Sequence, residues 1–210
     1  MNERKAHWEK VYDKNDMRQV SWFQVDPAPS LAFIDGLSLT HDAPVIDVGG
    51  GTSALTAQLI DRGMTNLSVL DISGQALMQA RMEMGEKAAS VQWIEQDVTE
   101  FAAPQRYALW HDRAVFHFLI TDQDQQKYRD VLRNAMQPGG YVLMATFAVE
   151  GPRRCSGLDT MQYDADLLQQ VLGKDFSLLE TRIEQHRTPS EAEQKFAWFL
   201  FQYQPGEGKS

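Results

Sequence analysis

Residues 45–53 of this chain read Val-Ile-Asp-Val-Gly-Gly-Gly-Thr-Ser. The apolar run at 45–48 ends in three glycines, which is typical of a buried parallel strand that leads into a turn. Glycines let the backbone turn tightly from strand to helix and let a ligand approach the amino end of that helix. The stretch therefore predicts a strand–turn–helix unit with a ligand at its turn; a turn without a ligand is the alternative interpretation.

Alternating strands and helices follow this unit along the chain. Apolar residues at helical spacing predict a helix that Thr52 or Ser53 caps and that ends at Gly63. Periodicity also predicts strands at 67–71, 91–94, 107–110 and 141–147, and helices at 73–88, 122–135 and 164–172. Two last strands, at 176–183 and 195–204, should pair antiparallel because a loop and no helix joins them. This order predicts one α/β domain with a parallel, doubly wound sheet and right-handed crossovers.

Composition and charge exclude several classes of partner. The chain has 210 residues, with 20 Lys and Arg against 29 Asp and Glu, so its formal net charge is −9. This acidic balance disfavours nucleic acid and anionic membranes. Residues 1–14 have no apolar centre and no apolar run approaches the roughly 18 residues of a membrane span, so we expect no signal peptide and no membrane helix. Cys155, the only cysteine, fits a reducing cytoplasm.

The metal-ligating residue types offer no metal site. Five histidines and one cysteine show no zinc-ligand spacing, so we expect no metal. Met78, Met82 and Met84 lie at helical spacing, and we interpret them as core residues.

Three acidic residues stand where the first three strands end. Asp47, two residues before the first glycine, would repel a pyrophosphate and attract an ammonium group, so the turn favours a cationic ligand with an adenosine-like body. Asp71 can accept hydrogen bonds from both hydroxyls of a ribose, although a helix-capping role is the alternative. Asp97 can accept from an exocyclic amine while Val98 donates its N–H to a ring nitrogen, unless Asp97 is an ordinary loop residue.

Together these residues resemble the motifs of the class I S-adenosylmethionine-dependent methyltransferases. The matching segments are residues 47–51, 70–71, 96–98, 110–112 and 137–141. The resemblance covers about residues 41–204 and implies a Rossmann-like, seven-stranded sheet in the order 3-2-1-4-5-7-6 with strand 7 antiparallel. It also implies S-adenosylmethionine as cofactor, S-adenosylhomocysteine as product, and a set of cofactor-binding residues. These are Tyr12, Trp22, Asp47, Gly49, Gly50, Gly51, Asp71, Ile72, Asp97, Val98 and Asp112.

The residues before the first strand form a separate feature, rich in aromatic and charged side chains. Their aromatic residues are Trp8, Tyr12, Trp22 and Phe23, and their start is similar to that of the small bacterial "type 12" methyltransferases, where such residues close over the cofactor. We therefore expect residues 1–40 to form an aromatic flap, with a mobile lid at 8–23. The methyltransferase domain is expected at 41–204 and a disordered tail at 205–210.

The end of the fourth strand supplies the candidate catalytic residues, because ligands of doubly wound sheets lie at the carboxyl ends of the strands. Either His111 or His117 can act as a base, and Asp112 can hold the ammonium group or the substrate. The alternatives are a histidine that is only packed and an ion pair between Asp112 and Arg113. The candidate substrate-binding residues are Phe116, His117, Cys155 and His186, with His186 in a loop expected at 184–194.

Cys155 itself has two interpretations. Two neighbouring arginines can lower the pKa of its thiol and let it bind a soft substrate atom, or it is a small packing residue.

We expect the protein to transfer a methyl group to a small-molecule nucleophile, as a cytoplasmic monomer or homodimer without nucleic-acid or membrane partners. A protein side-chain methyltransferase, a nicotinamide-dependent oxidoreductase and a non-catalytic S-adenosylmethionine-binding module are the alternatives.

Overall fold

The computed structural model describes residues 3–206, whose central feature is a seven-stranded sheet in the order β3-β2-β1-β4-β5-β9-β8. The parallel strands are β1 (Val45–Val48), β2 (Leu67–Asp71), β3 (Val91–Glu95), β4 (Tyr107–Arg113) and β5 (Met136–Phe147). Strand β9 (Glu193–Tyr203) runs antiparallel to both β5 and β8 (Phe176–Arg187). Because β6 (Arg154–Cys155) and β7 (Leu158–Asp159) form a separate hairpin, this is the predicted order 3-2-1-4-5-7-6.

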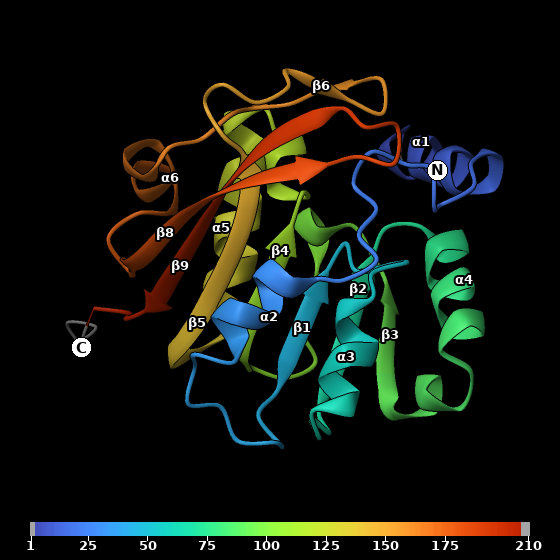
Figure 1. Ribbon diagram of the computed structural model, residues 1–210. Helices are drawn as coiled ribbons and strands as arrows, with labels where there is room; N and C mark the ends of the chain where they lie inside the picture. The colour runs from blue at the N-terminus through green and yellow to red at the C-terminus, as the bar shows by residue number, and fades with distance from the viewer. Residues whose placement is uncertain (1–2, 207–210) are drawn as a thin grey trace.

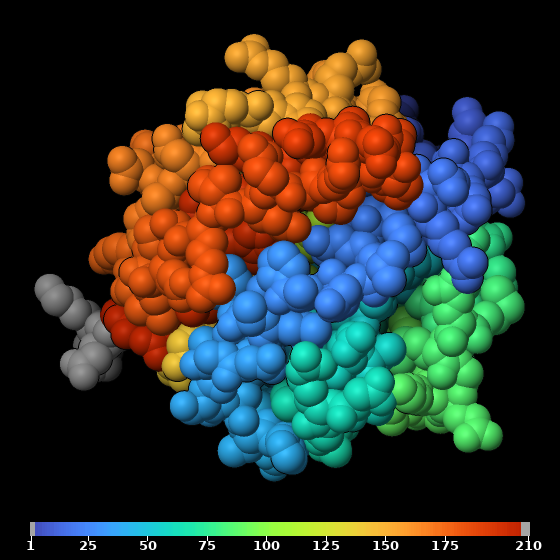
Figure 2. All heavy atoms as spheres, in the orientation of Figure 1, coloured from blue at the N-terminus to red at the C-terminus, as the bar shows by residue number. Residues whose placement is uncertain are grey.

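Helices cover both faces of the sheet (Figure 1). Residues of α2 (Ala28–Ile34), α3 (Leu55–Asp61) and α4 (Gly74–Met84) share one apolar cluster, whereas α5 (Asp122–Ala135) and α6 (Ala165–Leu172) contribute to the other. The first helix, α1 (Glu3–Lys14), packs on α4 at the edge of the domain. In the space-filling view of Figure 2, the N-terminal segment lies between the β8–β9 hairpin and helices α3 and α4. The N-terminal residues therefore belong to the folded domain and are not a separate body.

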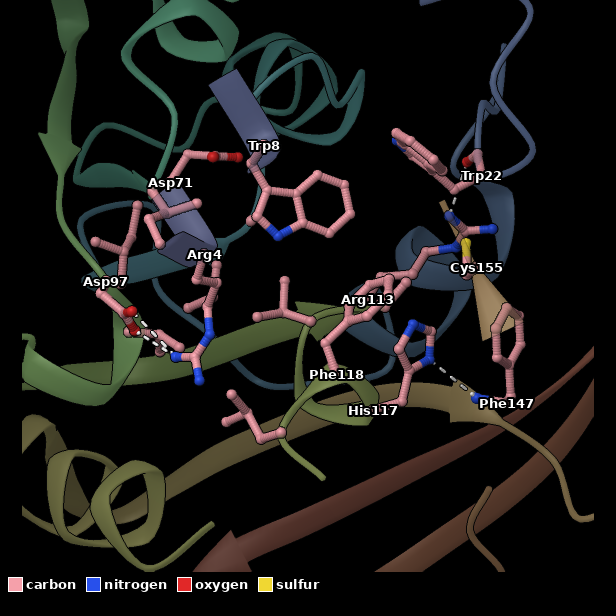
Figure 3. Close-up of a pocket in the computed structure, with 18 of the residues that line it drawn as sticks. Arg4, Trp8, Trp22, Asp71, Asp97, Arg113, His117, Phe118, Phe147 and Cys155 are labelled. Carbon is pink, nitrogen blue, oxygen red and sulfur yellow. Dashed lines mark hydrogen bonds and ion pairs between the residues drawn. The ribbon is translucent and has the colours of Figure 1, made fainter. Parts of the chain in front are cut away.

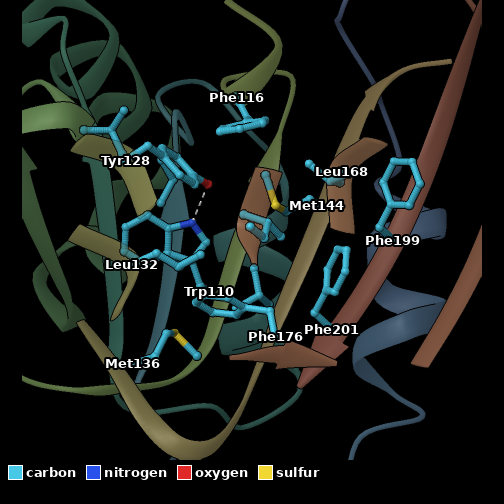
Figure 4. Close-up of a cluster of buried hydrophobic side chains, with 14 of the residues drawn as sticks. Trp110, Phe116, Tyr128, Leu132, Met136, Met144, Leu168, Phe176, Phe199 and Phe201 are labelled. Atoms are coloured by element: carbon cyan, nitrogen blue, oxygen red, sulfur yellow. Dashed lines mark hydrogen bonds between the residues drawn. The ribbon is translucent and has the colours of Figure 1, made fainter. Parts of the chain in front are cut away.

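Strand β4 divides its side chains between the two clusters. Trp110 is fully buried on the α5 side, where its indole N–H donates to the Tyr128 hydroxyl at 2.9 Å (Figure 4). Leu109 packs on the opposite side. Alternation along the strand then places His111 and Arg113 on the side of Leu109, and Asp112 on the side of Trp110.

Several element boundaries differ from those predicted. Strand β4 continues to Arg113 and β5 begins at Met136, so the proline and glycines at 138–140 lie within a strand. Strands β8 and β9 extend to Arg187 and from Glu193, which leaves a short loop in place of the one expected at 184–194. Cross-strand pairing thus continues through polar residues that carry no clear strand pattern in the sequence.

Two helix predictions are also corrected. The cap of α3 is Ala54, without a side-chain bond; Ser53 Oγ instead accepts from the N–H of Leu55 at 3.1 Å. Met78 and Met82 are 49% and 67% exposed, so their interpretation as core residues is wrong; they lie on the solvent side of α4.

Most of the predicted tail, from residue 207 onward, falls outside the described residues. Within residues 3–206, no helix combines the length and the apolar character that a membrane crossing requires.

Candidate active site

Two adjoining hollows lie at the carboxyl ends of the central strands. The larger encloses about 830 Å³, part of it open to solvent, and the smaller about 580 Å³. Both are lined by Tyr12, Trp22, Val48, Gly49 and Arg113, so they meet at the glycine turn. A ligand at this turn can therefore extend into both hollows.

The glycine turn packs directly against two carboxylates. Gly49 has a φ of +66°, and a Cβ there would lie 2.1 Å from the Val115 side chain. A Cβ on Gly50 would lie 2.5 Å from Asp47 Oδ2, and one on Gly51 would lie 2.8 Å from Asp71 Oδ2. The three glycines therefore let the backbone lie on these acidic groups, which no larger residue permits without displacing them.

Asp47 is buried below this turn and lines the smaller hollow. Its Oδ1 is 2.7 Å from His111 Nδ1, and His111 Nε2 is 3.0 Å from the hydroxyl of Ser30. Its Oδ2 is inaccessible to water and has no hydrogen-bond partner. A buried carboxylate oxygen without a donor is costly, so this atom fits a ligand that brings a donor, such as an ammonium group.

Asp71 and Ile72 line the larger hollow at the end of β2. The carboxylate of Asp71 accepts from the N–H of Gly51 at 3.2 Å and from that of Ser73 at 2.9 Å. Burial nevertheless raises the pKa of Asp71 to about 7, because these two bonds do not offset the loss of water. The carboxylate can still accept hydrogen bonds from ligand hydroxyls.

Asp97 and Val98 line the same hollow, at the end of β3. Arg4 of α1 donates to both oxygens of Asp97, at 3.1 and 3.0 Å, and also to Asp124 at 2.9 Å. Figure 3 shows this pair at one end of the hollow. Sequence reasoning missed Arg4, because no local pattern relates residues that lie 93 positions apart.

A second contact fixes α1 over the site. Glu9 accepts from the Ser73 hydroxyl at 3.1 Å and from the N–H of Gly74 at 2.8 Å, at the amino end of α4. Trp8 lies edge-on to Trp22 and Phe118, with ring centroids 5.9 and 5.1 Å apart. The segment is therefore closed over the hollow in this structure, while its predicted mobility stays a prediction.

The end of the larger hollow away from Asp97 is aromatic. His117 stacks on Phe147 at 4.4 Å between centroids, and Phe196 and Cys155 lie beside them. The N–H of Phe147 donates to His117 Nδ1 at 3.3 Å, and burial, aided by the nearby charge of Arg113, lowers the His117 pKa to about 3. The ring is therefore neutral and carries its proton on Nε2, which gives it a donor there and opposes the predicted role as a base.

Three other candidate residues lie away from the hollows. Asp112 accepts from the Tyr128 hydroxyl at 2.6 Å and from the N–H of Val115 at 3.0 Å, and it lines neither hollow. It does not pair with Arg113, because the two side chains leave opposite faces of β4. This geometry favours a structural role, the fixing of the turn after β4, over the predicted catalytic and cofactor-binding roles.

Phe116 and His186 are likewise placed elsewhere. Phe116 is fully buried against Tyr128 and Tyr163, on the α5 side of the sheet. His186 lies in β8, and its Nε2 is 2.8 Å from the carbonyl oxygen of Ser21. Neither residue lines a hollow, so the structure does not place them against a substrate.

Cys155 does line the larger hollow, 3.7 Å from the Ser21 hydroxyl. Burial raises the pKa of its thiol, which opposes the interpretation as an activated thiolate.

Comparison with known proteins indicates what kind of domain carries these hollows. Residues 45–140 match the family model of a methyltransferase domain. N-methyltransferase NodS from Bradyrhizobium japonicum WM9, solved with S-adenosylhomocysteine, is 16% identical with a TM-score of 0.71, over 95% of this chain and 98% of that one. A structure from work on conversion of a disulfide bond into a thioacetal group during echinomycin biosynthesis is 18% identical with a TM-score of 0.77, over 95% and 93%.

A mouse (Mus musculus) eEF1A lysine and N-terminal methyltransferase is 22% identical over 154 residues. That match covers 68% of this chain and about a fifth (21%) of the length of the relative.

Residues 45–140 therefore carry a methyltransferase domain, and the chain has the fold of the S-adenosylmethionine-dependent methyltransferases among these solved structures. Its residues fit the cofactor of this class: Asp47 Oδ2 can accept from the ammonium group, and Asp71 from the ribose hydroxyls. Asp97 and Val98 lie where an adenine would be bound, at the end of the next strand. These individual roles stay predictions, as does the resemblance to the "type 12" enzymes, with which the match is consistent.

Proposed function

We propose that this methyltransferase methylates a small-molecule nucleophile held in the aromatic end of the larger hollow. The observation that carries the proposal is the position of that space: it adjoins the glycine turn and is walled by Trp22, Phe118, Phe147 and Phe196. Trp8 covers it from α1 (Figure 3). Enclosed apolar pockets with few polar groups are typical sites for small ligands.

The bound cofactor supplies an electrophilic methyl group on a sulfonium, so the protein's part is binding, orientation and exclusion of water. Asp47 would bind the ammonium group of the cofactor and Asp71 its ribose hydroxyls. The N-terminal segment closes the space above them. Among residues 3–206, neither histidine at the end of β4 offers a free basic nitrogen, because His111 is bonded through both nitrogens and His117 Nδ1 is already an acceptor. We therefore expect an acceptor that is nucleophilic without a histidine base.

The first test is ligand binding. Calorimetry should show binding of S-adenosylhomocysteine and none of NADH; the reverse would favour a nicotinamide-dependent oxidoreductase. A second test incubates the protein with S-adenosylmethionine and a metabolite panel, and follows methylated products by mass together with S-adenosylhomocysteine release. Tight cofactor binding without turnover of any metabolite or protein would favour a non-catalytic binding module.

Protein methylation is the second candidate, because the curated relatives include a methyltransferase of eEF1A lysine and N-terminus. A protein side chain would have to enter beneath α1, which is anchored by Arg4 and Glu9. Incubation of a cytoplasmic extract with radiolabelled S-adenosylmethionine distinguishes the two candidates: label in protein bands supports this one, and label in the small-molecule fraction supports the first. The cytoplasm remains our proposed compartment.

A further inference from the structure

Arg113 carries hydrogen-bond donors that the protein leaves unused. It is the last residue of β4, and its Nη1 donates to the carbonyl oxygen of Trp22 at 3.0 Å. Its guanidinium carbon lies 4.8 Å above the Phe196 ring. Its Nε and Nη2 are inaccessible to water and have no hydrogen-bond partner. These two atoms form the side of the guanidinium whose parallel N–H groups match the two oxygens of a carboxylate. We call this pair of N–H groups of Arg113 the fork.

His117 adds a third unused donor beside this fork. Because its Nδ1 accepts from the backbone, its Nε2 carries the proton, and Nε2 is also buried without a partner. Figure 3 shows the two side chains next to each other, with Phe118 on one side and Phe147 and Cys155 on the other. The lowering of the His117 pKa by the charge of Arg113 agrees with this proximity.

The positive charge of Arg113 has no ion-pair partner within residues 3–206. Asp47, one of the acidic groups that influence it, is engaged with His111. The other, Glu184, accepts from Gln24 at 3.0 Å and from the Trp198 indole at 2.6 Å. Burying a cation whose donors have no hydrogen-bond partners is costly. The presence of Arg113 in an apolar hollow therefore indicates a ligand that supplies a negative charge.

We propose that Arg113 and His117 bind a carboxylate group of the methyl acceptor. This inference rests on the proposed function and narrows its substrate class to small apolar carboxylates. The cofactor has a carboxylate of its own, but the ammonium acceptor Asp47 lines only the smaller hollow, whereas His117 lines only the larger. Arg113 lines both hollows, but His117, which supplies the third donor, lines only the larger one, so the three donors can act together only there, where the aromatic walls would surround the rest of the acceptor.

Nuclear magnetic resonance of the 15N-labelled protein, saturated with S-adenosylhomocysteine, tests the inference at the atoms concerned. Acetate is small enough to reach the fork and should shift the Arg113 Nε–H and His117 Nε2–H resonances in a saturable manner. Acetamide has nearly the same shape without the charge, and it should bind at least about tenfold more weakly. No saturable shift, or equal affinity for the two probes, overturns the inference.

Variants of Arg113 assign the resonances, and they separate the contribution of its paired N–H groups from that of its positive charge. Arg113→Gln should bring the acetate affinity down to that of acetamide, and Arg113→Lys, which keeps the charge but lacks the fork, should weaken acetate at least about fivefold. Arg129→Gln is the matched control, because Arg129 also has a buried, unpartnered Nε and donates to a carbonyl, that of Val171, away from both hollows. The Arg129→Gln variant should bind acetate as tightly as the unchanged protein does. If it lost as much acetate affinity as Arg113→Gln, a site at Arg113 would be contradicted.

The same titrations separate this inference from the proposed function. If S-adenosylhomocysteine does not bind, the proposed function fails, and acetate titration of the free protein still reports on the fork. If S-adenosylhomocysteine binds and itself abolishes the acetate response, the fork holds the cofactor's carboxylate and the inference fails alone.

Discussion

Asp47 and His111 lie opposite each other in the register of β1 and β4, with Asp47 Oδ1 2.7 Å from His111 Nδ1. Ser30 of α2 contacts the far nitrogen of the same imidazole at 3.0 Å. These two contacts, from Ser30 to His111 and from His111 to Asp47, thus fix Oδ1 of the carboxylate and leave Oδ2 for a ligand. His111 is therefore a positioning residue for Asp47.

This arrangement predicts a selective defect in Asp47→Asn. The amide cannot offer the negative oxygen that an ammonium group needs, so affinity for S-adenosylhomocysteine should fall at least about tenfold. Affinity for 5′-methylthioadenosine, which lacks the amino-acid part, should stay within about twofold. Calorimetry with both ligands measures the difference. Equal losses for the two ligands would mean that Asp47 acts on the adenosine end or on the fold.

Asp71 predicts how cofactor affinity depends on pH. Its pKa of about 7 in the free protein means that it is largely protonated at pH 6 and largely ionised at pH 8. Ribose hydroxyls donate to the ionised form, so binding should release a proton. Affinity for S-adenosylhomocysteine should therefore rise about tenfold from pH 6 to pH 8, in proportion to the ionised fraction.

Asp71→Asn is the control, since it has no proton to lose. Its affinity should be lower than that of the unchanged protein at pH 8 and nearly constant between pH 6 and 8. A pH dependence that persists in this variant would assign the titration to another group.

The glycine turn predicts a contrast between two alanine variants. Gly49 and Gly85 both have positive φ, +66° and +57°, a backbone conformation that residues with a Cβ rarely adopt, so both alanine variants should be strained. Only at Gly49 would the new Cβ meet another side chain, Val115, because nothing lies within 4 Å of a Cβ at Gly85. Gly49→Ala should lose S-adenosylhomocysteine binding, whereas Gly85→Ala should keep it even though its midpoint of thermal unfolding is lowered. Loss of binding in both variants would show that general destabilisation suffices.

The positions of most strands could be predicted from the sequence because they depend on local signals, whereas the strand order followed from the family resemblance. Apolar runs followed by glycines or acids mark strand ends, and these ends meet at one edge of a parallel sheet. The acceptor end was harder to predict, because strand β4 was expected to end at Trp110. Strand β4 in fact continues to Arg113. Side chains alternate between the two faces of a strand, so Asp112 points away from the face that His111 and Arg113 share, and Arg113 reaches the larger hollow.

The contacts of the N-terminal segment could not be predicted, because no local pattern in the sequence indicates them. Arg4 reaches Asp97, and Glu9 reaches the amino end of α4, from a helix whose place on the sheet is set only by the tertiary fold. His117 lines the larger hollow, and its expected place at the substrate stays a prediction; its protonation depends on the backbone N–H of Phe147, which the sequence does not place.

The state of His117 can be checked directly. With a pKa of about 3, its ring should remain neutral from pH 5 to pH 9, with the proton on Nε2. Long-range 1H–15N correlation spectra distinguish the two tautomers and should show no titration of this ring over the range. An ionisation near pH 6.5, or a proton on Nδ1, would restore His117 as a candidate base.

The closed position of α1 leads to the last prediction. Arg4 bonds to Asp97, and Glu9 to the start of α4, so α1 spans the larger hollow between two polar anchors. Such anchors are partly exposed and stabilise the closed form only modestly, since ion pairs near the surface contribute at most about 1 kcal/mol. The cofactor would add the contacts of a bound ligand beneath the helix, which favours the closed form further.

Amides of α1 (Glu3–Lys14) should therefore exchange with deuterated solvent at least about tenfold more slowly once S-adenosylhomocysteine is bound, whereas those of α6 (Ala165–Leu172), which contributes to neither hollow, should not change. Arg4→Met removes one anchor and should speed exchange of α1 in the free protein more than in the complex, because the ligand still holds the helix from below. Hydrogen-exchange mass spectrometry measures both comparisons. If protection of α1 is the same with and without ligand, the segment is a fixed wall of the pocket, and acceptor entry has to occur by another route.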